Sequence, residues 1–352
     1  MAKIEPALIS SFSVKGCDES VKQWPTNVSN VELYAFMQSD LKNYFISLKQ
    51  TADEACPNAL CVMADQWKNQ EVCDSVASII NDRYKGKSII AFATFLPELT
   101  SFETNEAVWT APQQAQCFLI ALSRALQRFG HPISTIQIAG GSRTDGVDLI
   151  SNMGFANSYT VNRLCIDKAV DRLIERLGPV AKFALIEPKI QIAVELEPGP
   201  WFTIGEAAAL KKFCERIDSD PKNPLYSVVG VNLDIPHWDF LSGITVDWLQ
   251  KPENDVVRKR IIHCHISDHS NGHFGCHVTG TFHPGEFEEW IQLVVEQGGQ
   301  YREPNYPKYS GYISCEMEGC KHKEFVQQCV DELIGLLATV KTQDNVCTAV
   351  SP

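Results

Sequence analysis

The sequence predicts an α/β protein that folds as one (β/α)8 TIM barrel, a parallel eight-stranded barrel with outer helices. Short apolar runs alternate with amphipathic segments along all 352 residues. A parallel connection between two strands needs a crossover, which a helix supplies, and eight such units close naturally into a barrel. Because no Pro-, Gly- or Ser-rich linker divides the chain, we expect one domain over residues 1–352, ending in a flexible tail at about 341–352.

Each strand is predicted from a β-branched or apolar run. The eight runs are ALISSFSV (7–14), ALCVMADQW (59–67), SIIAFATF (88–95), STIQIAGG (134–141), QIAVELEP (191–198), SVVGVNLD (227–234), RIIHCHIS (260–267) and GYISCEME (311–318). Helices are predicted where apolar residues recur at three and four residues, over 111–130, 167–180, 203–217, 285–299 and 322–340. The first of these segments has Pro near its start and Gly at its end, which is the usual asymmetry of helix ends.

Composition limits the function classes. A content of 44% hydrophobic and 21% charged residues is typical of a soluble globular protein. The net charge of −12 argues against nucleic-acid binding, which needs basic surface. The chain has no apolar run of about 18 residues, and its start carries Glu and Pro before any apolar run, so neither a membrane span nor a secretory signal is expected. Thirteen cysteines without a CxxC pair favour a reduced, cytoplasmic protein.

The last four predicted strands each end in carboxylate or imidazole side chains, which are common metal ligands. These side chains are Glu195 and Glu197, then Asp234 and His237, then His263, His265, Asp268 and His269, and finally Glu316 and Glu318. The carboxyl ends of barrel strands meet at one face, and a buried charge is costly unless it is paired or metal-bound. We therefore expect carboxylates and imidazoles to converge on one divalent ion: Mn²⁺, Mg²⁺, Co²⁺ or Zn²⁺.

Four segments carry a resemblance to a known family. VELEPGP, GVNLDIPHW, IIHCHISDH and YISCEMEG resemble the strand-end motifs of the sugar isomerase/epimerase superfamily, the xylose-isomerase-like TIM barrels of the AP endonuclease 2 type. The resemblance covers about residues 185–335, where GTFHPGEFEEWI is similar to the family's turn into the next helix, and is thin before residue 130. Each motif is weak alone, but four in order at successive strand ends are specific.

The resemblance implies a ligand set for one divalent ion, with Mn²⁺ favoured. The ligands carried over are Glu197, Asp234, His265 and Glu316. Glu197 is chosen over Glu195 because the family's ligand directly precedes the loop, as the Glu-Pro pair does here. Glu316 is chosen over Glu318 because it lies nearer the apolar strand body. The resemblance also implies that His237 contacts substrate and that Asp268 supports the site without binding the metal.

Further candidates have both a functional and a structural interpretation. Glu195 and His263 either support the metal site or belong to the barrel interior. Trp201 and Trp238 either stack on substrate or pack in the core, and Arg143, after Gly140 and Gly141, either holds an anion or follows a plain Gly-rich turn. Finally, His269 and His273 lie in a predicted loop over the barrel mouth, where they either contact substrate or have no role in the site.

The resemblance implies a single-metal isomerase or epimerase acting on a sugar, ketose or related polyhydroxy carbonyl compound. Proton transfer would pass through an enediolate, with Glu197 and Glu316 as the acid/base pair. The strands predicted at 59–67 and 88–95 contain no His, unlike the three-metal endonuclease IV branch, so a nuclease is disfavoured. Alternatives are a metal-dependent lyase, dehydratase or hydrolase on a natural-product or sugar-derived substrate, and an inactive barrel that acts as a binding partner. Self-association into a homo-oligomer is left open.

Overall fold

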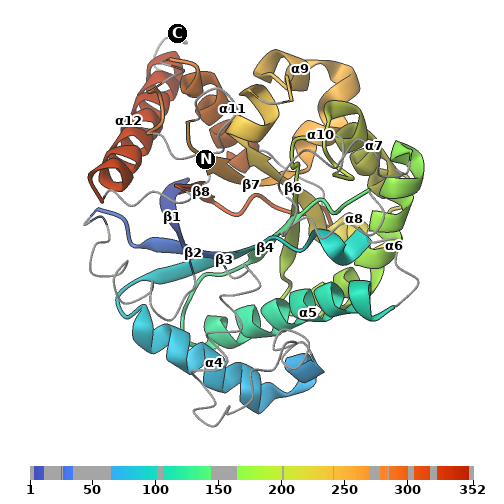
Figure 1. Ribbon diagram of the computed structural model, residues 1–352. Coiled ribbons are helices and arrows are strands. Elements are labelled where there is room, and N and C mark those ends of the chain that lie inside the picture. Colours follow the sequence, from blue (N-terminus) through green and yellow to red (C-terminus); the bar gives the residue numbers. More distant parts are fainter. Residues whose placement is uncertain are drawn as a thin grey trace, which may run out of the picture.

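The chain forms a closed barrel of eight parallel strands surrounded by helices (Figure 1). This computed structural model describes residues 4–11, 25, 27–34, 65–100, 106–143, 165–199, 202–240, 242–268, 278–281, 283, 285–299, 305–317 and 323–348. The strands follow one another around the barrel in chain order, and β8 pairs with β1 to close it. The predicted TIM barrel is confirmed.

The strands are short, with four to seven residues each. They are β1 (Glu5–Ser11), β2 (Asn30–Tyr34), β3 (Ser88–Thr94), β4 (Thr135–Ala139), β5 (Gln191–Glu195), β6 (Val229–Asp234), β7 (Ile261–Ile266) and β8 (Tyr312–Cys315). The α-helices are α4 (Gln70–Arg83), α5 (Ala107–Arg128), α6 (Ile166–Ala184), α7 (Ala207–Asp218), α8 (Pro224–Val228), α9 (Val246–Gln250), α10 (Asp255–Lys259), α11 (Phe287–Gly299) and α12 (Lys323–Thr348). Short turns of other helix types are η1 (Asp65–Lys68), η2 (Pro97–Thr100), η4 (Pro236–Phe240) and η5 (Pro252–Asn254).

Seven of the eight predicted strands overlap observed strands, and the second is wrong. The barrel takes β2 from Asn30–Tyr34, whereas the predicted strand at 59–67 ends in the 3₁₀ turn η1 and its residues 59–64 lie outside the described part. Within η1, Trp67 packs edge-on against Phe183 of α6, with ring centroids 4.6 Å apart. The apolar character of that segment therefore serves helix packing on the outside of the barrel.

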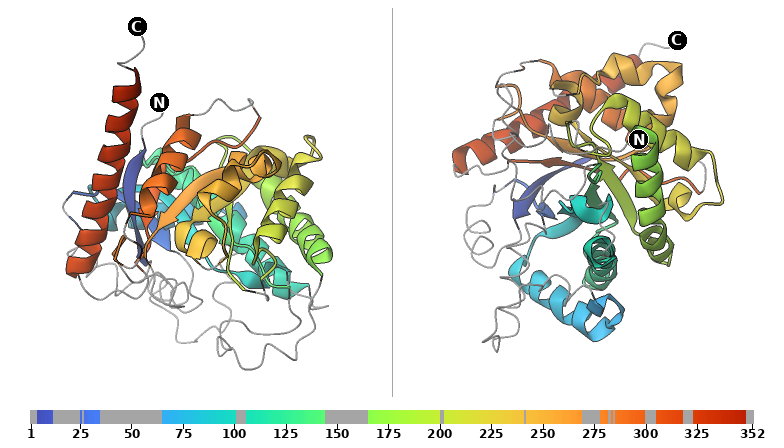
Figure 2. Two further views of the ribbon diagram at one scale, coloured as in Figure 1. Left: turned by 90° about the horizontal axis from the view of Figure 1, so that it is seen from above. Right: turned by 45° about the vertical axis from the view of Figure 1, so that its right-hand side comes forward.

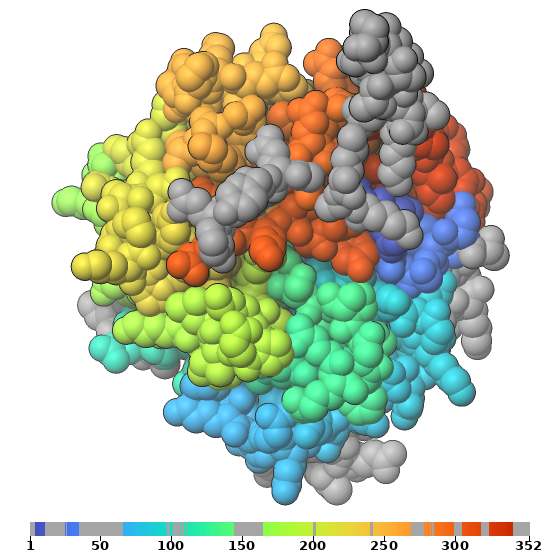
Figure 3. Space-filling view, turned by 180° about the vertical axis from the view of Figure 1, so that it is seen from behind, coloured from blue at the N-terminus to red at the C-terminus, as the bar shows by residue number. Residues whose placement is uncertain are grey.

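Apolar strands and amphipathic helices build the core between them. Strands that are covered on both faces read as continuous apolar runs, and β3 is buried over six of its seven residues. On α6, Leu173, Leu177 and Val180 recur at helical spacing and are fully buried. The two turned views show the helices packed outside the strands (Figure 2). Seen from behind, early, middle and late segments of the chain lie next to one another around one face, as expected for a closed barrel (Figure 3).

Helix α12 continues to Thr348, into the segment where a flexible tail is predicted. It lies beside α11, and one of its ends projects past the barrel (Figure 2). Seven cysteines in the described part of the chain are free, and six of them are buried. None of the described helices is both long and apolar enough to cross a lipid bilayer.

Candidate metal centre

Four side chains meet at the carboxyl ends of β5 to β8. Glu195 ends β5 and Asp234 ends β6, while His265 lies one residue before the end of β7 and Glu316 directly follows β8. Each offers one ligand atom, and these four atoms all lie within 4.8 Å of one another. The register pairs Asp234 with His265, so neighbouring strands present these two side chains at one level. Glu195, Asp234 and His265 are buried, and the Glu316 side chain is 15% exposed.

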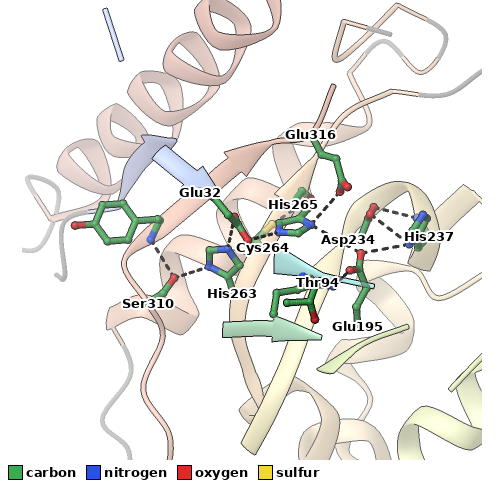
Figure 4. A network of polar contacts seen from close by, with 12 residues as sticks. Glu32, Thr94, Glu195, Asp234, His237, His263, Cys264, His265, Ser310 and Glu316 are labelled. Atoms are coloured by element: carbon green, nitrogen blue, oxygen red, sulfur yellow. Dashed lines mark hydrogen bonds and ion pairs between the residues drawn. The ribbon is translucent and has the colours of Figure 1, made fainter. Parts of the chain in front are cut away.

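The donor atoms fit a divalent cation. His265 Nδ1 lies 2.9 Å from Glu316 Oε2 and 3.8 Å from Glu195 Oε1 (Figure 4). Both His265 Nδ1 and Glu316 Oε2 are buried, and they form a close ion pair that lacks the geometry of a hydrogen bond. A cation held between them would give each atom the further partner that buried polar atoms normally have. Three carboxylates and one imidazole suit Mn²⁺, Mg²⁺, Co²⁺ or Zn²⁺.

Glu195 is oriented by a neighbouring strand. The Gln137 side chain on β4 donates from Nε2 to Glu195 Oε2, and its Oε1 accepts from the Thr94 backbone N–H at 2.9 Å. This second bond fixes which end of the amide faces Glu195. Burial raises the pKa of Glu195 well above its usual value, and the nearby charges of Glu197 and Glu316 add to the shift. A bound cation would favour the ionised carboxylate, which burial disfavours.

The structure places Glu195, where the sequence placed Glu197, in the four-residue cluster. Glu197 lies past the end of β5, and its backbone N–H donates to Ile204 O at 3.1 Å. Its carboxylate belongs instead to an adjoining group with Glu195 and His237. Burial, together with the charges of Asp234 and Glu316, raises the pKa of Glu197 to about 7, although His237 opposes the shift. The assignment changes because the strand ends before Glu197.

His237 borders the cluster from η4, the π-helical turn after β6. Its Nδ1 lies 3.3 Å from Asp234 Oδ2 and 3.4 Å from Glu195 Oε1. Its backbone N–H donates to Asp234 Oδ1 at 3.3 Å, which holds the turn against the end of the strand. Burial disfavours the charged imidazole, but Asp234 and the two glutamates outweigh it and hold the pKa of His237 well above its usual range. The predicted substrate contact thus lies at the edge of the cluster.

One buried carboxylate was missed by the sequence analysis. Glu32 lies in the middle of β2, is fully buried, and points toward both histidines of β7 (Figure 4). Its Oε2 is 2.8 Å from His263 Nε2, and its Oε1 is 3.2 Å from His265 Nε2. Although burial opposes ionisation, the two imidazoles hold the pKa of Glu32 far below its usual value. The available signal was a lone Glu inside the apolar run NVELY.

Other candidates have definite places in the structure. Asp268 is buried and accepts from His283, through the backbone N–H at 3.2 Å and through Nδ1 at 2.6 Å, so it anchors the entry to α11. Trp238 is fully buried in the core, in agreement with its packing interpretation. Arg143 faces Glu206 at 3.8 Å. The candidates outside the described residues are Trp201, His269, His273 and Glu318.

The glycines before Arg143 form a structural turn. Gly141 has φ +77°, and a Cβ there would approach Thr100 Oγ1 to 2.5 Å. Its carbonyl accepts from the Thr203 N–H at 2.7 Å. Because φ in this range favours glycine and the neighbouring side chain leaves no room for a Cβ, the turn itself explains this glycine.

Comparisons with known proteins point to one family. The model of the xylose isomerase-like TIM barrel family matches residues 124–328. No curated protein matches the chain. Among solved structures, an L-ribulose 3-epimerase is similar with a TM-score of 0.60 at 14% identity, over 100% of both chains. A xylose isomerase domain protein from Alicyclobacillus acidocaldarius is similar with a TM-score of 0.55 at 15% identity, over 96% of this chain and 99% of that one. The zinc-containing IOLI protein gives 0.54 and 12%, over 97% and 99%.

Proposed function

The chain belongs to the xylose isomerase-like TIM barrel family, and from this premise we propose that it is a divalent-metal-dependent isomerase or epimerase of a sugar, ketose or related polyhydroxy carbonyl compound. The observation that carries the proposal is the convergence of Glu195, Asp234, His265 and Glu316 at the carboxyl ends of four successive strands. In barrels of this kind the reacting groups project from these strand ends. The L-ribulose 3-epimerase with the same fold supports the choice of substrate class.

The residues at the site divide into metal ligands and supporting groups. Glu195, Asp234, His265 and Glu316 would hold the ion, and Mn²⁺ is the first metal to test. A bound ion would polarise a carbonyl or hydroxyl oxygen of the substrate. Gln137 keeps the Glu195 carboxylate in place, and His237 contacts the substrate from the rim of the site.

Two glutamates move the proton at the substrate carbon. Glu197 lies beside the cluster in the loop after β5, and Glu316 directly follows β8, so the two reach the site from different sides. A carboxyl at one side can accept the proton and a carboxyl at another can return it, which is the minimum that epimerisation or isomerisation requires.

Solvent deuterium incorporation tests the reaction class. Wild-type protein with Mn²⁺ should exchange a carbon-bound hydrogen of at least one member of a panel of ketoses, inososes and related α-hydroxy carbonyl compounds. Glu197→Gln and Glu316→Gln should each lower the exchange rate by about 10²–10⁴-fold. Glu187→Gln is the matched control, because its side chain is 76% exposed just before the opposite end of β5.

The outcomes separate the alternatives. Exchange that survives unchanged in both Gln variants would refute the roles of the two glutamates. A wild-type protein that binds Mn²⁺ but exchanges no hydrogen in any panel member would refute the isomerase or epimerase and turn the search to lyase and hydrolase substrates.

A further inference from the structure

Glu32 joins β2 to both histidines of β7 across the barrel interior through two hydrogen bonds. It is fully buried on the strand, and each of its carboxylate oxygens has an imidazole partner. We propose that Glu32 is the positioning residue of the metal centre: it holds His265 through Nε2, so that Nδ1 faces Glu195, Asp234 and Glu316. This proposal rests on the proposed metal site.

The direction of each hydrogen bond follows from the chemistry of the groups. An ionised carboxylate only accepts, so both imidazoles must donate from Nε2 to Glu32. The Tyr312 backbone N–H lies 3.3 Å from Ser310 Oγ, and that Oγ lies 2.8 Å from His263 Nδ1. Ser310 can therefore accept from Tyr312 and donate to His263, which leaves His263 Nε2 with its proton for Glu32. From Tyr312 through Ser310 and His263 to Glu32, each hydrogen bond can therefore be assigned one donor and one acceptor without conflict.

The consequence for His265 is a fixed ring orientation. With Nε2 committed to Glu32, the ring turns its second nitrogen toward the cluster, 2.9 Å from Glu316 Oε2 (Figure 4). Ligating histidines commonly have their second nitrogen held in this way, and loss of that partner costs about 10–100-fold in metal affinity. His263 packs edge-on beside His265, with ring centroids 5.3 Å apart, and so limits its rotation.

A second ion between Glu32 and the two histidines is the competing interpretation. The three residues offer ligand atoms within 4.8 Å of one another. Both Nε2 atoms, however, hydrogen-bond to an oxygen of Glu32, whereas His265 Nδ1 and Glu316 Oε2, on the other side of the His265 ring, form an ion pair without a hydrogen bond. The bonding pattern thus favours one ion, on the Nδ1 side.

The test uses Glu32→Gln. Gln keeps the shape of Glu but has one accepting oxygen, so only one of the two histidines retains its acceptor. We expect the Kd for Mn²⁺, measured by calorimetry, to rise about 10–100-fold, with wild-type protein binding a single ion. We also expect wild-type protein without metal to show exchange-protected Nε2–H signals from both histidines in ¹H–¹⁵N spectra, and the variant to lose one of them.

Asp218→Asn is the matched control. Asp218 accepts from Arg260, which lies at the opposite end of β7 from His265, so this variant also removes a charge that pairs with a buried group. It should lower the melting temperature and leave the Kd for Mn²⁺ unchanged. If Glu32→Gln does not fold, Glu32→Asp serves instead, because the shorter side chain cannot reach both Nε2 atoms and should weaken Mn²⁺ binding in the same way.

The outcomes distinguish this inference from the proposed function. An unchanged Kd in a folded Glu32 variant, or two bound ions in wild-type protein, would overturn the positioning role while leaving the metal-dependent enzyme intact. Absence of Mn²⁺ binding by wild-type protein would overturn the metal site and the positioning role together. Nε2–H signals that are unaffected by Glu32→Gln would overturn the contact itself.

Discussion

Replacing Glu195 by Gln should remove the metal ion, whereas replacing Glu197 by Gln should leave it bound. Glu195 Oε1 belongs to the four-atom cluster and lies 3.8 Å from His265 Nδ1, while Glu197 groups with Glu195 and His237 beside it. Both substitutions keep side-chain size and remove one carboxylate from the end of β5. The two variants therefore differ mainly in whether the lost charge faces the ion.

The expected magnitudes differ by at least a factor of ten. Without Glu195, three of the four ligand atoms remain. The loss of Mn²⁺ affinity should therefore exceed about 100-fold, which is the largest loss usual for removing a residue that only supports a ligand. That factor corresponds to about 2.8 kcal/mol at 25 °C. Glu197→Gln removes a neighbouring charge only, so its effect should not exceed about tenfold, the lower end for a residue outside the ligands.

Calorimetric titration with Mn²⁺ and the metal content of the purified proteins measure the difference. Glu187→Gln, at an exposed position before the start of β5, should behave as wild type. If Glu197→Gln loses the ion and Glu195→Gln retains it, the ligand assignment derived from the strand end is refuted and the one derived from the Glu-Pro pair is restored.

Three further outcomes follow from the same contacts. Chelation should lower the melting temperature, because an ion that binds only the folded state stabilises it, and Asp234→Ala should abolish this effect in a thermal shift assay. Mn²⁺ affinity should fall as the pH is lowered, because the raised pKa values of Glu195 and His265 mean that protons must leave before the ion binds. Calorimetry in buffers of different ionisation enthalpy should show proton release, and a pH-independent Kd would contradict this. Asp218→Ala should lower the free energy of unfolding, measured by urea denaturation, by about 3–5 kcal/mol, because it leaves the fully buried Arg260 without its carboxylate. A much smaller loss would contradict this and would mean that the backbone carbonyls bonded to Arg260 are enough to stabilise its charge.

The barrel could be predicted from the sequence because its signal is local and repeated. Seven strands are apolar runs long enough to stand out, and the helices between them carry their apolar residues at helical spacing. Strand β2 could not be found in this way. Its central residue is charged, and the more apolar segment at 59–67 competes with it in sequence but ends in η1.

The cluster could be predicted as a set, but the ligand from β5 could not be chosen. Residues two apart on a strand face the same side, so alternation gives Glu195 and Glu197 equal claims. The choice depends on where the strand stops. Pairing with β4 and β6 ends at Glu195, and Glu197 pairs its N–H with Ile204 in the following loop, so its direction no longer follows the strand.

The role of Glu32 could not be predicted from the sequence, because it depends on contacts with residues 231 and 233 positions away. A lone Glu in a short apolar run is read locally as a break in a strand, since a buried carboxylate costs several kcal/mol unless it is paired. The pairing becomes visible once the barrel brings the middle of β2 opposite His263 and His265. Conversely, a charged side chain that the fold buries is expected to have a partner nearby. In this barrel the partners of Glu32 are the two histidines that stand next to the metal cluster, and for that reason its removal should be measured first at the metal.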